Sequence, residues 1–249
     1  MSENFKDESC KSKSKLGVKI ESTFKFENSL SLFNKFFFLT KKYKYVAFTL
    51  AEILITIGII GIVAAITLPA VITNYQKQST ATKVKKFYNV INNAINMSIV
   101  NHGDVNTWYP ERKNNTYDDN VDFLKEYILP YIKYDRFEKS STSNAALIYL
   151  TNGGLILYNT DNNGTDIKYY INGKIEINPR NQFSFGFNKK DTTNSIFVEP
   201  YTFLWDGNYE TLKTSNQLSF GCRKECTNCN YCTKLLQLND WKFPDDYPW

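Results

Sequence analysis

Four cysteines near the end of the chain are the residues whose types and spacing could do chemistry. They follow the pattern C-x3-C-x2-C-x2-C, at Cys222, Cys226, Cys229 and Cys232. Four thiolates at these spacings can bind Zn²⁺ or an iron–sulfur cluster, whereas four thiols in an oxidising compartment pair as two disulfides. The choice between a metal site and disulfides therefore depends on where this segment folds.

The other candidates for chemistry are weaker. The one histidine, His102, falls where a long helix is expected to end, and we interpret it as solvated. Asp161, Asn163 and Asp166 could offer oxygens to Ca²⁺, but their spacing does not match the EF-hand loop, so a polar turn is preferred. The sequence holds no Walker A loop, dinucleotide fingerprint, G-x-S-x-G or H-E-x-x-H motif. We therefore expect no enzyme, no cofactor and no bound metal.

The longest apolar stretch of the chain, residues 48–72, is the element around which the rest is organised. It carries one charge, Glu52, and its isoleucine, leucine, valine and alanine residues leave no polar face. About 20 apolar residues are enough to cross the hydrocarbon core of a bilayer. Because a surface helix would show a polar side, the pattern predicts a membrane-spanning helix.

Glu52 needs an explanation in such a segment, because a carboxylate inside a membrane costs about 2.5–3.5 kcal/mol on insertion scales. It lies four residues, or one helical turn, after Phe48. If the chain were cut before Phe48, the new α-amino group would supply a positive charge for Glu52 of the same chain or of a neighbour. The alternative is that Glu52 lies near the lipid headgroups, where a charged side chain costs little free energy. The residue types alone leave both interpretations open.

Several features before and within the apolar stretch occur together in one register. They are a lysine cluster at Lys41, Lys42 and Lys44, the run AFTLAE at residues 47–52, the apolar stretch after it, and Pro69. With these features, residues 41–100 resemble the N-terminal region of type IV pilins and type II secretion pseudopilins. The sequence departs from the family at Ala47, where glycine is usual, and in the length of its leader, residues 1–47.

The resemblance implies a processing event and a role for each of these residues. In that family a prepilin peptidase cuts just before the phenylalanine and methylates the new N-terminus, and the glutamate helps to seat each subunit in a filament. Here the cut would fall between Ala47 and Phe48, Glu52 would act in assembly, and Pro69 would bend the helix. The implied partners are the prepilin peptidase, other pilin or pseudopilin subunits, and the bacterial inner membrane.

The charge distribution indicates topology rather than nucleic-acid binding. Residues 1–47 contain ten lysines and five acidic residues and so carry the whole net charge of +5, whereas residues 48–249 contain 20 basic and 20 acidic residues. By the positive-inside rule, the N-terminus stays in the cytoplasm and the domain after this single span lies outside it. Four lysines after the span partly oppose this bias: Lys77, Lys83, Lys85 and Lys86. No nucleic-acid partner is expected.

An extracytoplasmic location favours disulfides over a metal at the cysteine cluster. A nested pairing, Cys222 with Cys232 and Cys226 with Cys229, is slightly preferred, although the sequence leaves the connectivity open. The fifth cysteine, Cys10, lies in the leader and would be lost with it.

Beyond the span, the residue pattern predicts an α+β fold, which is also the architecture that the resemblance to pilins implies. Apolar residues recur at intervals of three and four, so the helix should bury one stripe against a globular domain. The stripe consists of Val84, Phe87, Tyr88, Ile91, Ala94, Ile95 and Ile99. Polar residues, Asn92 among them, fall largely between these positions.

A short helix is expected over 121–129, followed by an antiparallel meander. Strands are expected over 146–150, 155–159, 167–171 and 174–177, with a tight hairpin at Asn172-Gly173. Phe183, Phe185 and Phe187 alternate on one face, and residues 195–198 and 201–205 are expected to be further strands.

The predicted organisation has three parts: a removed leader (1–47), a long helix (48–101) whose first part (48–72) is transmembrane, and an extracytoplasmic domain (102–249). The expected function is that of a pilin-like subunit of a type II secretion or type IV pilus system. Its filament would stand in the periplasm or at the cell surface and support protein secretion. The alternative is an uncleaved, single-pass anchored binding module in which the four clustered cysteines hold a metal.

Overall fold

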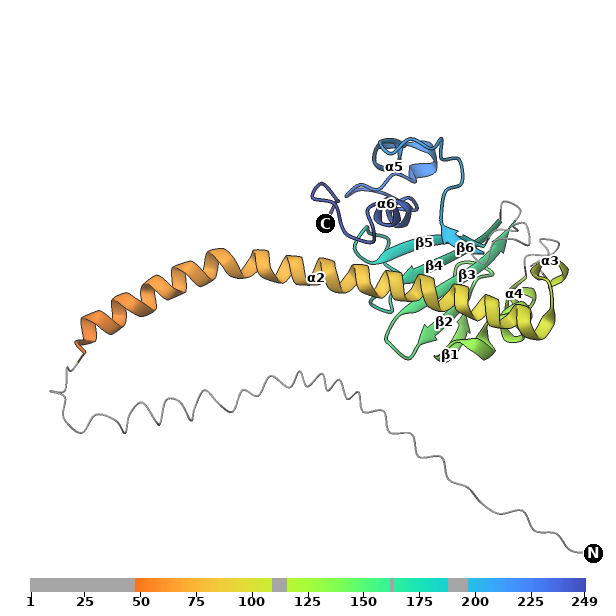
Figure 1. The fold of residues 1–249 in the computed structure, drawn as a ribbon, viewed down its shortest axis with the longest axis horizontal. Coiled ribbons are helices and arrows are strands. Elements are labelled where there is room, and N and C mark those ends of the chain that lie inside the picture. Colours follow the sequence, from red (N-terminus) through yellow and green to blue (C-terminus); the bar gives the residue numbers. More distant parts are fainter. Residues whose placement is uncertain (1–47, 109–115, 162–163, 188–196) are drawn as a thin grey trace, which may run out of the picture. The chain divides into compact units, whose positions relative to one another are not determined.

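The computed structural model describes residues 48–108, 116–161, 164–187 and 197–249. The expected leader, Ala47 and Asn163 lie outside these residues, as does the side chain of Asp161. The described residues divide into two units at Ile59/Ile60, residues 48–59 and the described residues of 60–249, and each is considered by itself. The fold belongs to the α+β class, with a long helix followed by an antiparallel sheet (Figure 1).

One helix, α2 (Leu50–His102), contains both the apolar stretch and the amphipathic stripe. The helix assignment continues unbroken through Pro69, although proline cannot donate a hydrogen bond to the carbonyl four residues earlier. Every side chain from residue 48 to residue 72 is exposed, and the first buried one is Ala81. The half of α2 that packs against the domain therefore begins only after a polar stretch of the helix.

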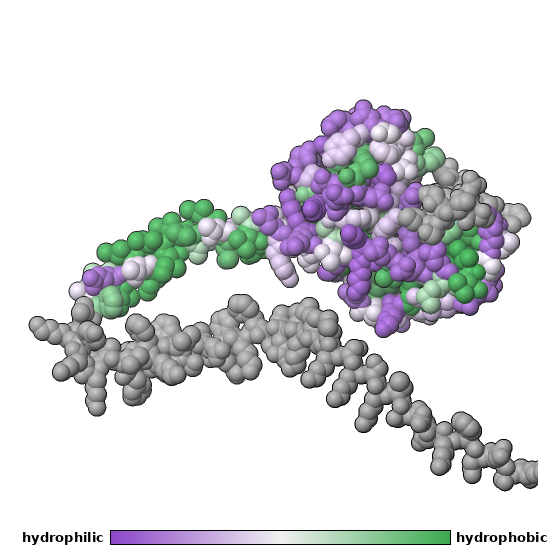
Figure 2. Space-filling view, in the orientation of Figure 1, coloured by the Kyte–Doolittle hydropathy of each residue, from purple (hydrophilic) through white to green (hydrophobic). Residues whose placement is uncertain are grey.

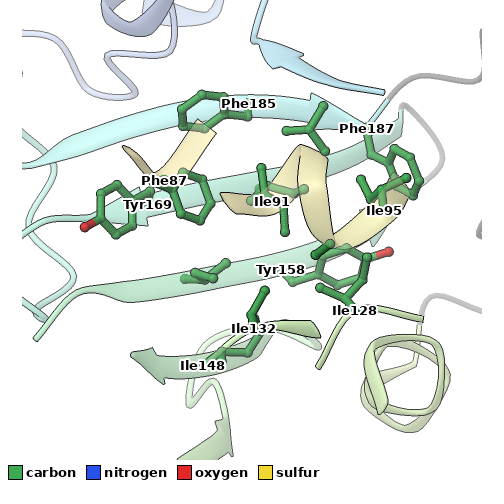
Figure 3. Close-up of a cluster of buried hydrophobic side chains, with 14 of the residues drawn as sticks. Phe87, Ile91, Ile95, Ile128, Ile132, Ile148, Tyr158, Tyr169, Phe185 and Phe187 are labelled. Carbon is green, nitrogen blue, oxygen red and sulfur yellow. The ribbon is translucent and has the colours of Figure 1, made fainter. Parts of the chain in front are cut away.

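The second half of α2 buries one stripe against the sheet. Phe87 stacks on Tyr169 with ring centroids 4.4 Å apart and lies 5.2 Å from the Phe185 ring, an arrangement visible in Figure 3. Burial of a side chain of this size stabilises a fold by about 1.5–3 kcal/mol. The buried apolar positions on α2 are Ala81, Val84, Phe87, Ile91, Ala94 and Ile95, with Tyr88 and Ile99 half-buried beside them; the buried polar positions are Asn92 and Ser98. The predicted stripe is thus the stripe that packs.

Six strands form one antiparallel sheet in sequence order. They are β1 (Tyr134–Lys139), β2 (Ala146–Leu150), β3 (Leu155–Asp161), β4 (Gly164–Tyr170), β5 (Gln182–Phe187) and β6 (Val198–Pro200). Alternate residues of a strand face opposite sides, and on β5 the side chains of Phe183, Phe185 and Phe187 all enter the core shared with α2. On the opposite side of β5, Gln182 and Ser184 are also buried, and their side chains bond to Asn228 and Asn230 in the C-terminal part of the chain.

The hairpin expected at Asn172-Gly173 does not form, because β4 pairs with β5 and the segment between them is a loop. Asn181 holds this loop: its side-chain amide donates to the carbonyls of Lys174 at 3.0 Å and Glu176 at 3.2 Å. The backbone carbonyls of Lys174 and Glu176 therefore have hydrogen-bond donors without pairing to another strand. Ile175, whose alternation with polar residues suggested a strand, is 47% exposed.

The short helix α4 (Tyr117–Tyr127) begins earlier than the predicted span of 121–129. Its N-cap is Thr116, whose hydroxyl accepts the backbone N–H of Asp119 at 3.1 Å. The Asp119 carboxylate accepts the Thr116 backbone N–H in return, which completes a capping box. The helix gives way to the 3-10 turn η1 (Leu129–Tyr131), which contains Pro130.

Residues 201–249 form what we call the C-terminal lobe. It contains α5 (Thr211–Thr214), the 3-10 turn η2 (Gln217–Ser219) and α6 (Cys232–Leu238). α6 contacts β5 and β6, and its Leu236 reaches the core under α2. The strand expected near Tyr201 is absent from the described lobe, whose backbone there is irregular. One further short helix, α3 (Val105–Trp108), follows α2.

Candidate functional site

The carboxylate of Glu52 is held by Thr49 at the start of α2. Its Oε2 atom accepts the Thr49 backbone N–H at 2.8 Å and the Thr49 hydroxyl at 3.0 Å, and the same hydroxyl accepts the Glu52 N–H at 3.2 Å. The pattern Thr-x-x-Glu is a capping box, which satisfies N–H groups that an α-helix leaves unpaired at its start. Sequence analysis missed this role, although the spacing signals it. Both bonds to the carboxylate use Oε2, and within the described residues Oε1 accepts none.

The helix that follows Glu52 is long and apolar enough to cross a membrane by its length and composition. The first half of the helix is largely green, the colour of hydrophobic residues, in Figure 2. Its hydroxyl groups are satisfied internally, because Thr67 donates to the Val63 carbonyl and Thr73 to the Pro69 carbonyl, each at 2.9 Å. Internal pairing of polar groups is what an apolar environment requires of a helix.

Two glycines open the surface of this apolar half. At Gly58 and at Gly61, a Cβ atom would meet nothing within 4 Å. Small residues of this kind let another helix approach closely in an apolar medium. The apolar half of α2 thus has features that suit lipid and features that suit a neighbouring helix.

The four cysteines of the C-terminal lobe are joined as Cys222–Cys232 and Cys226–Cys229, a nested arrangement. All four are buried, and they make up four of the nine buried residues in the hydrophobic cluster of the lobe. Their sulfurs are bonded to each other and are therefore unavailable as thiolate ligands. Across the described residues, no group of three or more histidine, cysteine or acidic side chains is arranged to hold a metal ion.

The segment closed by these disulfides is bonded to the polar side of β5. Gln182 donates its side-chain N–H to the Asn228 carbonyl, and the Ser184 hydroxyl donates to the Asn230 side-chain oxygen at 2.8 Å. Gln182, Ser184 and Asn230 are all buried. Buried polar groups that are paired in this way fix the orientation of the lobe on the sheet, because an unpaired group there would cost about 1–3 kcal/mol.

Ion pairing and hydrogen bonds also order the outside of the lobe. The Lys213 ammonium lies 2.7 Å from the Asp246 carboxylate, which raises the pKa of Lys213 and lowers the pKa of Asp246. A hydrogen bond from the Thr211 hydroxyl at 2.6 Å, followed by the Asn208 backbone N–H, lowers the pKa of Asp206. These contacts tie the end of the chain and one lobe loop to α5.

The weaker candidates from the sequence do not converge on a site. The ring of His102 lies edge-on to Tyr127, with centroids 5.0 Å apart, and its residue is exposed. Asp166 is half-buried on β4, while Asn163 and the side chain of Asp161 lie outside the described residues. Glu52 and the cysteine cluster belong to different compact units and are considered as separate features.

Comparison with known proteins identifies one family. The model of a family of unknown function, DUF6613, matches residues 70–249. The chain belongs to DUF6613. No curated protein and no solved structure matches it. The DUF6613 match begins one residue after Pro69, so it covers the packing half of α2, the sheet and the C-terminal lobe. Residues 47–69, which contain most of the pilin-like run, lie before the match.

Asn92 is the residue of this region whose role sequence analysis misjudged most. It was assigned to the polar side of the helix, yet it is only 6% exposed. Its side-chain oxygen accepts the backbone N–H groups of Phe197 and Val198, both at 3.0 Å, and its N–H group donates to the Val198 carbonyl at 2.9 Å. No local signal marks asparagine as buried, since the residue is usually polar surface or turn.

Proposed function

We propose that this member of DUF6613 is a pilin-like structural subunit, a pseudopilin or a pilin. In this proposal residues 48–72 anchor the precursor in the bacterial inner membrane, a prepilin peptidase cuts between Ala47 and Phe48, and the subunit enters a filament that supports protein secretion. The observation that carries the proposal is the division of α2. Its first half exposes apolar side chains on every side, and its second half buries one stripe against an antiparallel sheet.

The exposed apolar half of α2 must be shielded from water by lipid or by another protein surface. Contiguous apolar surface of this kind is rare on monomeric proteins in water and marks contact with membrane or protein. Before assembly the cover would be lipid, and after assembly it would be the same helix of neighbouring subunits, which Gly58 and Gly61 allow to approach. One surface would therefore serve both states in succession.

Glu52 supports the same proposal through its remaining hydrogen-bonding capacity. Thr49 occupies only Oε2, so the charged carboxylate can still accept a bond from an ammonium group. A cut before Phe48 creates such a group one residue before the capping box. Pairing the two charges would offset the cost of keeping a carboxylate at membrane depth.

The decisive experiment is the N-terminal mass of the protein purified from its host, measured by top-down mass spectrometry. The proposal predicts a chain that begins at Phe48 and carries one methyl group on its α-amine. A protein that begins only upstream of Lys41 would refute processing and would favour an uncleaved, membrane-anchored binding module.

A further inference from the structure

The charges on α2 are all of one sign after Glu52. Between residues 53 and 102 the helix contains four lysines and no aspartate or glutamate. Three of them, Lys83, Lys85 and Lys86, are exposed, and the exposed Lys242 of the C-terminal lobe lies near Lys85 and Lys86. We call Lys83, Lys85, Lys86 and Lys242 the lysine strip.

Part of the lysine strip borders a hollow of about 450 Å³ between α2 and the loop after α6. Lys85, Lys86 and Lys242 line it together with Trp241, and Asp240 is the one carboxylate in its wall. None of the ion pairs found in the described part of the chain involves a residue of the strip. The strip thus presents a net positive surface without a partner inside the described molecule.

A surface of opposite sign lies on α4. Asp118, Asp122 and Glu126 are exposed and follow one another at intervals of four, so they form a single row along this helix, which we call the acidic stripe. Asp119, between them in sequence, is occupied by the capping box. The cation of α4, Lys125, points to another element, because its ammonium lies 5.4 Å from the centre of the Phe137 ring.

The strip and the stripe are too far apart to meet within one molecule. α4 lies beside the end of α2, where Tyr127 contacts His102. Lys85 lies 17 residues before His102, which at 1.5 Å per residue is about 25 Å along the helix axis. Two complementary charged surfaces at opposite ends of one unit suit a head-to-tail contact between copies.

The distance from the apolar segment argues against lipid headgroups as the partner of the strip. Lys85 lies 13 residues beyond Ile72, or about 20 Å along the helix. The polar layer on each side of the hydrocarbon core is only about 5–8 Å thick. Lys77, about 8 Å beyond Ile72, is the residue that would reach the headgroups.

We infer that the lysine strip of one copy of this chain binds the acidic stripe of a second copy, giving a head-to-tail contact along the filament. This inference rests on the proposed function, since a filament is what places copies in succession along the helix direction. The partner is a second copy of the same chain, recognised by carboxylates in a row on a helix. The contact gives adjacent subunits a defined order as well as an attraction.

Photo-cross-linking in cells tests the contact with the full chain, co-expressed with a prepilin peptidase. A benzophenone amino acid replaces Thr82, which is exposed and lines the hollow beside Lys85. We expect an adduct with peptide 117–127 of a second copy. The adduct should fall at least about tenfold in K85E/K86E and in D118K/D122K, because like charges then face each other. It should return in the chain that carries all four substitutions, and when the two double variants are co-expressed.

The matched control for K85E/K86E is K174E/K224E, which reverses two exposed lysines outside the strip and changes the net charge by the same amount as K85E/K86E. It should give as much adduct as the unsubstituted chain. An adduct with lipid or with another protein, or no recovery in the four-substitution chain, would overturn the inference. The N-terminal mass is measured in the same samples: a chain that begins at Phe48 without this adduct refutes the contact alone, and a chain that begins upstream refutes the proposed function.

Discussion

The side chain of Asn92 on α2 satisfies both backbone hydrogen-bonding groups of Val198 on β6. Its oxygen accepts the Val198 N–H at 3.0 Å, and its amide donates to the Val198 carbonyl at 2.9 Å. β6 is a three-residue strand at the edge of the sheet, where one side of the ladder has no neighbouring strand. Asn92 takes the place of that neighbour and attaches the edge of the sheet to the helix.

Replacing Asn92 with alanine should therefore destabilise the domain more than its size suggests. The change leaves the N–H groups of Phe197 and Val198 and the Val198 carbonyl without their partner, in a buried position. We expect a loss of about 2–4 kcal/mol in the free energy of unfolding, measured by urea denaturation of the purified protein. Amide hydrogen exchange should also become faster at Val198.

Asn93 provides the matched control, because it is the next residue on the same helix and is exposed. The N93A variant should change the free energy of unfolding by less than about 0.5 kcal/mol. Equal effects of N92A and N93A would mean that the bonds to Val198 contribute nothing beyond helix propensity.

Substitutions of Glu52 separate its capping role from its proposed role in assembly. E52Q keeps an oxygen for the Thr49 capping box but removes the charge, whereas E52A removes both. If the charge acts in assembly, both variants should be processed to Phe48 and both should yield few filaments by electron microscopy. Filaments from E52Q at the level of the unsubstituted chain, together with failure of E52A, would assign Glu52 to helix capping alone.

The proposed processing should depend on the residue before the cut. Replacing Ala47 with a bulky leucine should leave the precursor uncleaved, since the small side chain stands where type IV pilins usually have glycine. The A47G variant is the control and should be cleaved at least as fast as the natural chain. The ratio of precursor to mature protein on an immunoblot measures both, and normal cleavage of A47L would show that the cut lies elsewhere.

The two disulfides should contribute unequally to stability. Loop-closure entropy predicts about 3 kcal/mol for a loop of ten residues, as in Cys222–Cys232, and about 1.5 kcal/mol for three residues, as in Cys226–Cys229. Urea denaturation of C222A/C232A and C226A/C229A tests this order, and a larger loss in the second variant would contradict it. A mature chain beginning at Phe48 should also contain no thiol that reacts with iodoacetamide before reduction.

Two buried tyrosines make the fold sensitive to alkali. Burial raises the pKa of Tyr169 and of Tyr170 to about 12, against about 10 for an exposed tyrosine. The folded state therefore disfavours the ionised phenols, so their contribution to stability is complete below pH 10 and is lost as the pH rises from about 10 to about 12. Melting temperatures should fall across that range, with a late phase in the phenolate absorbance.

The Y170F variant tests the assignment, since it removes one late-titrating hydroxyl and its bond to Gln182. Its late phase should shrink, and its melting temperature should fall less steeply above pH 10. Titration of all phenols near pH 10 while the protein remains folded would show that these rings are accessible to solvent.

The parts of the fold that follow from a repeating pattern were predictable. The three-and-four spacing located the stripe on α2, and the alternation of Phe183, Phe185 and Phe187 located β5. The parts set by single polar side chains were not. Asn92 and Asn181 look like surface or turn residues in sequence, yet each one bonds to backbone groups far along the chain or across a loop. The false hairpin at Asn172-Gly173 arose because local turn chemistry was weighed without the competing bonds of Asn181.

The candidate site was predictable to the extent that it depends on residue type and spacing. The cysteine spacing indicated two disulfides or a metal, and the structure contains disulfides. The charge of Glu52 was recognised as exceptional in an apolar stretch. Its capping partner Thr49 was not predicted, because a capping box is evident only when the start of the helix, here Leu50, is known. The lysine strip and the acidic stripe could not be related from sequence, since their separation depends on where α4 lies against α2.

The polar stretch of α2 between the apolar run and Ala81 has a consequence for handling the protein. Residues 73–80 extend over about 12 Å of helix without a single buried side chain. Because no packed side chains protect the backbone hydrogen bonds of residues 73–80, this segment should unfold locally more readily than the domain. Limited trypsin digestion after Lys77 should accordingly release the apolar segment and leave a water-soluble fragment that keeps every α2 residue of the main core.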